Sequence, residues 1–295
     1  MTRAGFIALL GFPNAGKSTL LNRLVGYPLS AITPKPQTTR FSIPAILTTS
    51  DTQYIFIDTP GWIAHPKNMW HRALMHQSLS AARDSDVQVW VLSLTQNELA
   101  LPEPIETLAQ NLPYLLGAFS HGDKLSPPDR AKQIAYIQDA LSRFPFKGWT
   151  DASLDQPLDP FLKLVASGLP TSPFLYPEGD ITILPLRFFV GEILREVLYR
   201  HLHEEIPYGA EVQVSQYSEK EDRDYIAATI YVEKDSHKKI LIGQNGQMIK
   251  KIGTEARMKI EGLLGKPIYL DLYVKVAPKW RRSPRLLRSL GYGTS

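Results

Sequence analysis

Residues 11–18 read Gly-Phe-Pro-Asn-Ala-Gly-Lys-Ser and fit the pattern G-x-x-x-x-G-K-[ST], a phosphate-binding loop known as the P-loop. An apolar run at residues 6–10 precedes the loop and predicts a buried parallel strand. Residues 19–26 follow with helical spacing and end in a glycine, which is typical of a helix terminus. Strand, loop and helix in this order bring backbone N–H groups onto phosphates. The alternative is a glycine-rich turn that binds nothing.

Each position of the loop has an expected partner on a nucleotide. Lys17 is expected to reach the β- and γ-phosphates, and Ser18 to place its hydroxyl on Mg²⁺. The predicted nucleotide contacts of this segment are Asn14, Ala15, Gly16, Lys17, Ser18 and Thr19.

A second short motif follows the next apolar strand. Residues 54–57 are Tyr-Ile-Phe-Ile, and Asp58-Thr59-Pro60-Gly61 comes directly after them. In P-loop GTPases a strand ending in D-x-x-G carries the second carboxylate of the magnesium site. Asp58 would hold Mg²⁺ through water, and the Gly61 amide would meet the γ-phosphate. Residues 30–40, between the two motifs, have two prolines and no apolar period, which predicts an exposed loop.

Alternating strands and helices continue down the chain. Residues 87–94 and 114–119 predict strands, and residues 98–112 and 128–144 carry helical spacing. This alternation predicts βαβ units and a mostly parallel sheet. Residues 145–180 are rich in Pro, Gly, Asp and Ser, and predict a loop, one short strand at 161–166 and a linker.

Composition restricts the class of protein. The chain has 295 residues, enough for two domains, and 43% of them are hydrophobic. It has no cysteine, which excludes disulfides and thiolate metal sites. The first strand is expected to begin within a few residues of Met1, without a signal peptide, and no apolar run approaches the ~18 residues of a membrane span. We therefore expect a soluble, cytoplasmic protein.

Charge is distributed unevenly along the chain. The formal net charge is +4, but residues 231–295 carry 14 Lys and Arg against 5 Asp and Glu, a net of +9. Residues 1–230 are left with −5. A basic end on a mildly acidic body favours a polyanionic partner, and a solvated basic surface is the alternative.

The basic end has its own motif. After a predicted amphipathic helix (187–202) and two strands (211–217 and 225–232), residues 238–253 read KKILIGQNGQMIKKIG. They predict a short helix, a G-x-x-G turn and a longer helix to about Leu264, followed by a strand at 268–276. This order is typical of a KH domain with an extra N-terminal helix, in which the G-x-x-G backbone clamps RNA. The predicted RNA contacts are Lys238, Lys239, Ile242, Gly243, Gln244, Asn245, Gly246, Lys250, Lys251, Lys279, Trp280 and Arg281.

Taken together, the two halves resemble the Era family, bacterial GTPases with a C-terminal KH domain. The resemblance covers nearly the whole chain. It rests on the P-loop, Gln37-Thr38-Thr39-Arg40, D-x-x-G, the G-x-x-G segment and a tail with Trp280 and Leu287-Arg288-Ser289-Leu290-Gly291-Tyr292. It implies an α/β P-loop GTPase domain at 1–170, a linker at 171–185, and an α+β KH domain with tail at 186–295.

The resemblance also implies roles for single residues. Thr39 (or Thr38) would close over Mg²⁺ in the GTP state, and the catalytic set would be Lys17, Thr39 and Gly61. Asn14 lies where related GTPases coordinate K⁺, with a turn-forming Asn as the alternative. Trp62 follows Gly61 where Ras-like enzymes carry a water-orienting Gln, so slow hydrolysis is expected.

Two segments depart from the family pattern. The guanine motif N-K-x-D is replaced by Ser120-His121-Gly122-Asp123, in which Asp123 can still accept from the guanine N1 and N2 protons. The S-A-K-type loop expected after residues 161–166 is poorly matched by Val165-Ala166-Ser167-Gly168, and Pro170 and Pro173 follow. The GTPase domain is therefore predicted to lack its last helix.

These observations predict a GTP- and Mg²⁺-dependent protein, with K⁺ as a further ion. By resemblance it binds the 3′ end of small-subunit ribosomal RNA and acts in assembly of that subunit, as a monomer with weak peripheral membrane association. Two alternatives remain: a nucleotidase-dead RNA-binding factor, and an enzyme that hydrolyses ATP or several NTPs.

Overall fold

The computed structural model describes residues 1–96, 106–107, 112 and 114–293. The chain divides into two compact units, which are described separately. The first unit comprises residues 1–30, 39–66 and 74–183. The second unit comprises residues 31–38, 67–73 and 184–295, so two short N-terminal segments group with the C-terminal part of the chain.

The described strands of the first unit form one sheet in the order β2-β3-β1-β4-β5-β6. Neighbouring strands run parallel except β2, which is antiparallel to β3. Their bounds are β1 Arg3–Leu10, β2 Ile43–Thr48, β3 Thr52–Asp58, β4 Val87–Ser93, β5 Leu115–Ser120 and β6 Gly148–Asp151. Every residue of β4 and β5 is buried, because a parallel sheet is covered on both faces.

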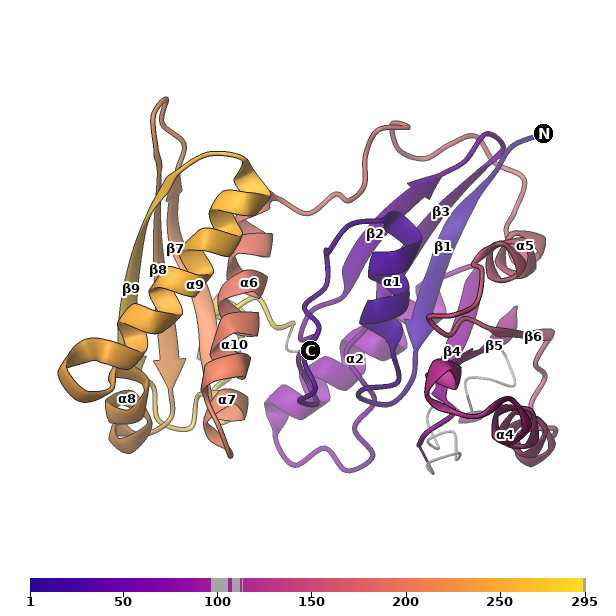
Figure 1. Cartoon of the computed structure of the whole chain (residues 1–295), viewed down its shortest axis with the longest axis horizontal. Coiled ribbons are helices and arrows are strands. Elements are labelled where there is room, and N and C mark those ends of the chain that lie inside the picture. Colours follow the sequence, from indigo (N-terminus) through magenta and orange to yellow (C-terminus); the bar gives the residue numbers. More distant parts are fainter. Residues whose placement is uncertain (97–105, 108–111, 113, 294–295) are drawn as a thin grey trace. The chain divides into compact units, whose positions relative to one another are not determined.

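Among the described residues, the helices that accompany this sheet are α1 Lys17–Val25, α2 Met69–Asp84, α4 Pro127–Ala140 and α5 Asp159–Gly168 (Figure 1). A short 3₁₀ turn, η1, spans Gly122–Lys124. Helix α1 packs against β2 and β3, and α5 packs against β6. The helix predicted over 98–112 falls almost wholly outside the described residues.

The end of the first unit corrects two of the predictions made from sequence. Residues 161–166, expected as a strand, lie inside helix α5, so the first unit does have a last covering helix. Its Phe161 and Val165 are buried on the inner face, and Pro160 stands in its first turn, where proline is well tolerated. The last strand is β6, which pairs in parallel with β5. The loop that follows this strand is therefore residues 152–156, and not Ser167-Gly168.

The second unit is built on strands β7 Glu211–Ser218, β8 Asp224–Val232 and β9 Ile268–Val276. Strand β7 is antiparallel to β8, and β8 is parallel to β9. The helices are α6 Leu186–His201, α7 Ile206–Gly209, α8 Asp235–Ile242, α9 Gln247–Leu264 and α10 Pro284–Ser289, with 3₁₀ turns η2 Gln244–Gly246 and η3 Trp280–Arg282. This is the order of elements predicted for a KH domain.

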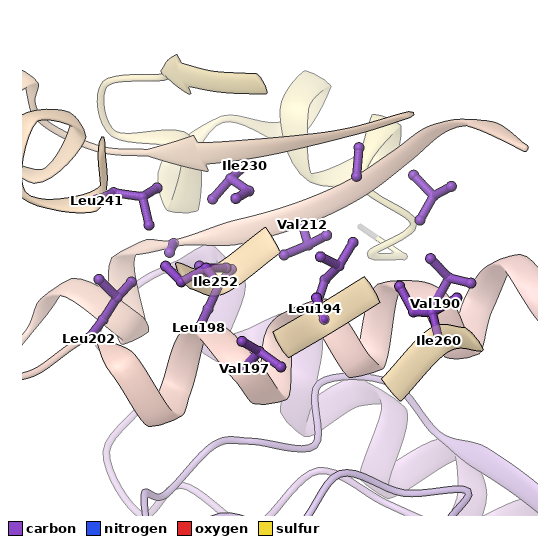
Figure 2. Close-up of a cluster of buried hydrophobic side chains, with 14 of the residues drawn as sticks. Val190, Leu194, Val197, Leu198, Leu202, Val212, Ile230, Leu241, Ile252 and Ile260 are labelled. Atoms are coloured by element: carbon purple, nitrogen blue, oxygen red, sulfur yellow. The ribbon is translucent and has the colours of Figure 1, made fainter. Parts of the chain in front are cut away.

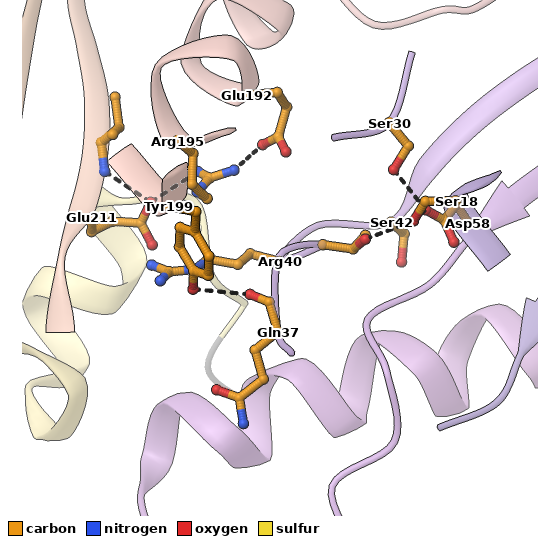
Figure 3. A network of polar contacts seen from close by, with 12 residues as sticks. Ser18, Ser30, Gln37, Arg40, Ser42, Asp58, Glu192, Arg195, Tyr199 and Glu211 are labelled. Carbon is orange, nitrogen blue, oxygen red and sulfur yellow. Dashed lines mark hydrogen bonds and ion pairs between the residues drawn. The ribbon is translucent and has the colours of Figure 1, made fainter. Parts of the chain in front are cut away.

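One hydrophobic core holds the second unit together. Helices α6 and α9 place Leu194, Leu198, Ile252 and Ile260 against Ile230 of β8 and its neighbours, and all of these side chains are buried (Figure 2). A buried ion cluster lies beside the core. Arg195 contacts the carboxylates of Glu192 and Glu211, and its Nη2 lies 2.9 Å from Glu211 Oε1 (Figure 3). Among the helices that the structure describes, none combines the length and hydropathy needed to cross a bilayer.

Candidate nucleotide site and RNA-binding groove

The P-loop connects β1 to α1, as the sequence predicted. Lys17, the first residue of α1, is only 5% exposed, and its Nζ donates to the carbonyls of Gly11 (3.0 Å) and Phe12 (2.8 Å). The ammonium group is therefore folded over the loop, where phosphates are expected. Burial lowers the pKa of Lys17 to about 8, and the nearby carboxylate of Asp58 opposes this shift.

Three side chains predicted to hold Mg²⁺ come together at the end of the loop. Ser18 Oγ donates to Asp58 Oδ2 at 2.6 Å and lies 3.0 Å from Thr39 Oγ1. Thr38 does not join them, because its hydroxyl lies 2.6 Å from that of Thr33 and 2.8 Å from the carbonyl of Lys35. Thr39, and not Thr38, is therefore the residue positioned for the metal.

The sequence did not point to a fourth member of this cluster, Ser30. Its hydroxyl donates to Asp58 Oδ2 at 2.7 Å (Figure 3). Its backbone is held by Asn22 through two hydrogen bonds. Asp58 is fully buried, which raises the pKa of its carboxyl group, while Lys17 and the three surrounding hydroxyls oppose the increase.

The donor set of this cluster fits Mg²⁺. The second carboxylate oxygen of Asp58, Oδ1, is buried and makes no hydrogen bond to any described residue. A buried carboxylate oxygen with no partner, next to two hydroxyl groups, offers the hard oxygen ligands that Mg²⁺ prefers. Ser18, Thr39 and Asp58 would hold the ion, directly or through water.

The D-x-x-G segment lies directly against the P-loop. A side chain at Gly61 would come within 2.7 Å of Pro13 Cα, so only glycine permits this approach. The backbone N–H of Trp62 donates to the carbonyl of Gly11 at 3.0 Å, and the indole ring is buried. Asn14 is exposed at the tip of the P-loop and has a positive φ of 59°, a conformation that Asn tolerates.

The end of the site that would hold the guanine base, called the base end below, contains the residues that replace N-K-x-D. Ser120 Oγ donates to the carbonyl of Ala15 at 2.7 Å, which ties the end of β5 to the P-loop. His121 Nδ1 lies 2.8 Å from Ser93 Oγ, and burial and the nearby Lys124 lower its pKa. Asp123 is exposed, so its carboxylate is accessible to a base.

A second loop, residues 152–156, completes the base end and was placed incorrectly from the sequence. Its Ser153 Oγ accepts the backbone N–H of Gly122 at 2.7 Å, which links the loop to the turn that carries Asp123. Arg130 of α4 donates to Asp151 and Asp155, each at 2.7 Å. The sequence indicated this loop only weakly, because β6 is a short edge strand without an apolar run.

In the second unit, the G-x-x-G turn joins α8 to α9. Gly243 has a φ of 75°, and a side chain there would come within 2.7 Å of Met248 Cβ, so this position requires glycine. Gln244 and Asn245 between the glycines are exposed. The turn therefore presents its backbone and the amide side chains of Gln244 and Asn245 to solvent. The lysines around it, Lys238, Lys239, Lys250 and Lys251, are exposed or half-buried.

A groove runs beside this turn, between α9 and β9. Its floor is apolar and includes Ile249, Leu270 and Leu272, and its rim carries basic side chains. Arg223 and Arg257 line it together with the predicted Lys250. Neither arginine was predicted from the sequence, and neither was Tyr269, which is 52% exposed at the groove. An exposed aromatic residue in a basic, apolar-floored groove suits unstacked bases.

The tail corrects one predicted RNA contact. Trp280 is fully buried, and its Nε1 donates to the carbonyl of Gly209 at 2.9 Å, so its ring is not available for stacking on a base. Arg281 contacts Glu233, whereas Lys279 is exposed.

Comparison with known proteins agrees with this architecture. Residues 6–118 match the family described as 50S ribosome-binding GTPase, and residues 205–281 match the KH domain family. GTPase Era of Geobacter metallireducens is 36% identical over 298 residues, which cover 98% of each chain. GTPase Era of Mesorhizobium japonicum is 38% identical over 296 residues, covering 98% of this chain and 94% of that protein.

Two solved structures superpose on nearly the whole chain. A crystal structure of Era in complex with MgGDPNP and nucleotides 1506–1542 of 16S ribosomal RNA has a TM-score of 0.91 and 31% identity, covering 99% of this chain and 100% of that one. An Aquifex aeolicus Era variant bound to GDP and aluminium fluoride has a TM-score of 0.90 at the same identity and coverage. With more than a third of its residues identical to curated relatives over almost its full length, this chain belongs to the Era family of GTPases.

Proposed function

We propose that this GTPase is a slow, guanine-preferring enzyme that uses its KH unit to bind the 3′ end of small-subunit ribosomal RNA and acts in assembly of that subunit. The observation that carries the RNA part is the groove between α9 and β9, with Arg223, Lys250 and Arg257 on its rim. It lies beside a glycine turn that exposes backbone where an RNA phosphate would approach. The related Era was crystallised with nucleotides 1506–1542 of 16S ribosomal RNA.

At the nucleotide, the chain's own residues have separate tasks. Bound Mg²⁺ would neutralise charge on the β- and γ-phosphates. Lys17 donates to phosphate oxygens once it releases the carbonyls of Gly11 and Phe12, and Asp123 accepts from the guanine N1 and N2 protons. Trp62 is buried and offers no acceptor to orient water, which supports slow intrinsic hydrolysis.

The test of the RNA part uses the full chain and an RNA copy of nucleotides 1506–1542, with a scrambled RNA of equal length as control. Gly246→Asp should weaken binding by at least about tenfold, because it brings a negative charge to the phosphate-facing turn. No atom lies within 4 Å of where its side chain would begin, but the φ of 77° at Gly246 strains any side chain, so the thermal unfolding of this variant is compared with that of the parent. Gly243→Asp should also weaken binding, but it requires a folding check because of its contact with Met248.

A matched control is Gly262→Asp. Gly262 is an exposed α9 residue with open space around it, and it is not among the groove-lining residues. Gly262→Asp adds the same charge to the same unit and should leave RNA affinity within about twofold.

The salt dependence of binding is a further test. The logarithm of the RNA association constant should fall by about 0.7 per log unit of salt for each phosphate that the protein neutralises. Equal affinity for the scrambled RNA would refute the proposed specificity for the 3′ end. An unchanged RNA affinity in Gly246→Asp would refute the assignment of the groove as the RNA site.

The nucleotide part has two competing functions to exclude. A nucleotidase-dead RNA-binding factor would bind GDP and ADP weakly or not at all. An enzyme with altered base choice would bind both with similar affinity. Calorimetric titration of GDP and ADP in the presence of Mg²⁺ separates them, and our proposal requires a clear preference for GDP.

The remaining parts of the proposal concern ions and location. K⁺ would bind beside the phosphates at Asn14, which is exposed at the P-loop tip, so hydrolysis should be faster in K⁺ than in Na⁺. The protein would act as a cytoplasmic monomer with weak peripheral membrane association. Sedimentation and cell fractionation test these two points.

A further inference from the structure

Arg23 joins the helix that begins at the P-loop to the loop at the base end of the site. It lies in the last turn of α1, six residues after Lys17. Its Nη1 donates to the carbonyls of Ala152 and Ser153, each at 3.0 Å, and its Nη2 donates to the carbonyl of Gln156 at 2.7 Å. Because a guanidinium group is planar and presents its donors in a fixed fork, these three bonds define the path of the loop backbone.

The loop held by Arg23 in turn holds the residue that would read the base. Ser153 is 1% exposed, and its hydroxyl accepts the N–H of Gly122 at 2.7 Å. Gly122 is the first residue of the turn that carries Asp123. A continuous series of hydrogen bonds therefore leads from α1 through Ser153 to the turn with Asp123.

Two other polar side chains near the turn, Ser120 and Arg130, make different contacts. Ser120 is short, and its hydroxyl already donates to the carbonyls of Ala15 and, at 3.3 Å, Leu92. Both of these contacts lie outside the 152–156 loop. Arg130 braces the same loop from α4, but through the side chains of Asp151 and Asp155 and not through the backbone.

We propose that Arg23 is a positioning residue of this GTPase. By fixing the backbone of residues 152–156, it lets Ser153 hold the turn that presents Asp123 to guanine. Base preference in this chain then depends on an arginine of the phosphate-binding helix, at a place where N-K-x-D is incomplete. This inference rests on the proposed guanine preference.

The experiment measures GDP and ADP affinity by calorimetry in the full chain with Mg²⁺. Arg23→Ala should weaken GDP binding by about tenfold and change ADP binding less than about twofold, because only guanine uses the Asp123 contact. Ser153→Ala removes a single hydroxyl and should reproduce the change in the GDP-to-ADP ratio. Arg23→Lys retains a cationic donor and should recover part of the preference.

A matched control and a double variant separate positioning from general stability. Arg83→Ala removes an exposed arginine from the last turn of α2 and should leave both affinities unchanged. In an Asp123→Ala background, Arg23→Ala should have no further effect on the GDP-to-ADP ratio, because both changes remove the same contact. Additive effects on the ratio, or equal losses for GDP and ADP, would overturn the inference.

A second measurement does not depend on base preference. Hydrogen–deuterium exchange at the amide of Gly122 should accelerate in Arg23→Ala and Ser153→Ala and stay unchanged in Arg83→Ala. Unchanged exchange in Arg23→Ala would overturn the positioning role whatever the affinities are. If the parent protein bound GDP and ADP equally, the proposed guanine preference would fail, and the exchange data would still decide the role of Arg23.

Discussion

The two ends of the nucleotide site are built in different ways. At the phosphate end, Lys17, Ser18 and Asp58 belong to two short contiguous motifs, and their side chains are buried or half-buried and bonded to one another or to the loop. At the base end, only Asp123 matches the expected motif, and the turn is held by Ser153 and Arg23, which come from distant parts of the chain. Local motifs define the phosphate end, and tertiary contacts define the base end.

The largest effect is expected at the phosphate end. Lys17→Ala should weaken GDP binding by about a hundredfold or more, because it removes the charged hydrogen bonds to the β-phosphate, the one of its two expected phosphates that GDP carries. Lys124→Ala, which changes an exposed lysine of the base turn, serves as the control and should have a much smaller effect. The circular dichroism spectrum should be unchanged in both. Equal GDP affinity in Lys17→Ala and the parent would refute the assignment of the phosphate end.

The pKa of Lys17 gives the phosphate end a pH dependence. In the free protein this pKa is about 8, whereas a bound phosphate stabilises the charged amine and raises it. Above pH 8 the amine must take up a proton when the nucleotide binds, so GDP affinity should fall as pH rises. Between pH 8 and 9 the affinity should decrease by about fivefold, as the charged fraction of the free amine falls.

Calorimetry in two buffers with different ionisation enthalpies measures this proton uptake directly. At pH 8.5 more than half a proton should be taken up per GDP bound, and at pH 7 very little. Uptake that does not change with pH would show that Lys17 is already fully charged in the free protein.

A smaller effect is expected from repairing the base end. Ser120→Asn together with His121→Lys should tighten GDP binding by up to about tenfold and leave ADP binding within about twofold. The asparagine restores a contact for the base O6, and the lysine replaces an imidazole whose pKa is lowered by burial. If the double variant binds GDP no better, Ser120 and His121 do not limit the affinity for guanine. The contacts that hold the 120–124 turn would then be sufficient without the Asn and Lys of the motif.

The same division explains what the sequence could predict. Strands β1, β3, β4 and β5 are buried apolar runs next to recognisable motifs, and their positions were predicted within a few residues. Helices α8 and α9 surround G-x-x-G and were predicted with their turn. Ser18, Thr39 and Asp58 were expected at one magnesium site, and the structure places the Ser18 hydroxyl within hydrogen-bonding distance of both Thr39 and Asp58.

The wrong predictions share a physical cause. Residues 161–166 are a short apolar run whose period does not distinguish a buried strand from a buried helix face. Pro160 precedes this run and stands in the first turn of α5, a position that proline favours. Strand β6 is only four residues long, half-buried and without an apolar run. Helix α2 was not predicted from the sequence. The roles of Ser30 and Arg23 were not predicted either, because only the folded chain brings Ser30 to Asp58 and Arg23 to the 152–156 loop.

The fully buried indole of Trp280 has a practical consequence for work on the tail. This ring donates to the carbonyl of Gly209 and is fully buried, and Leu287 and Tyr292 of the same tail are buried as well, so the tail contributes three buried side chains to the second unit. A C-terminal truncation before Trp280 removes a large buried aromatic ring and leaves a cavity, so it should lower the melting temperature before it changes any RNA contact. A shortened protein that loses RNA binding is therefore informative only after its thermal unfolding has been compared with that of the intact chain.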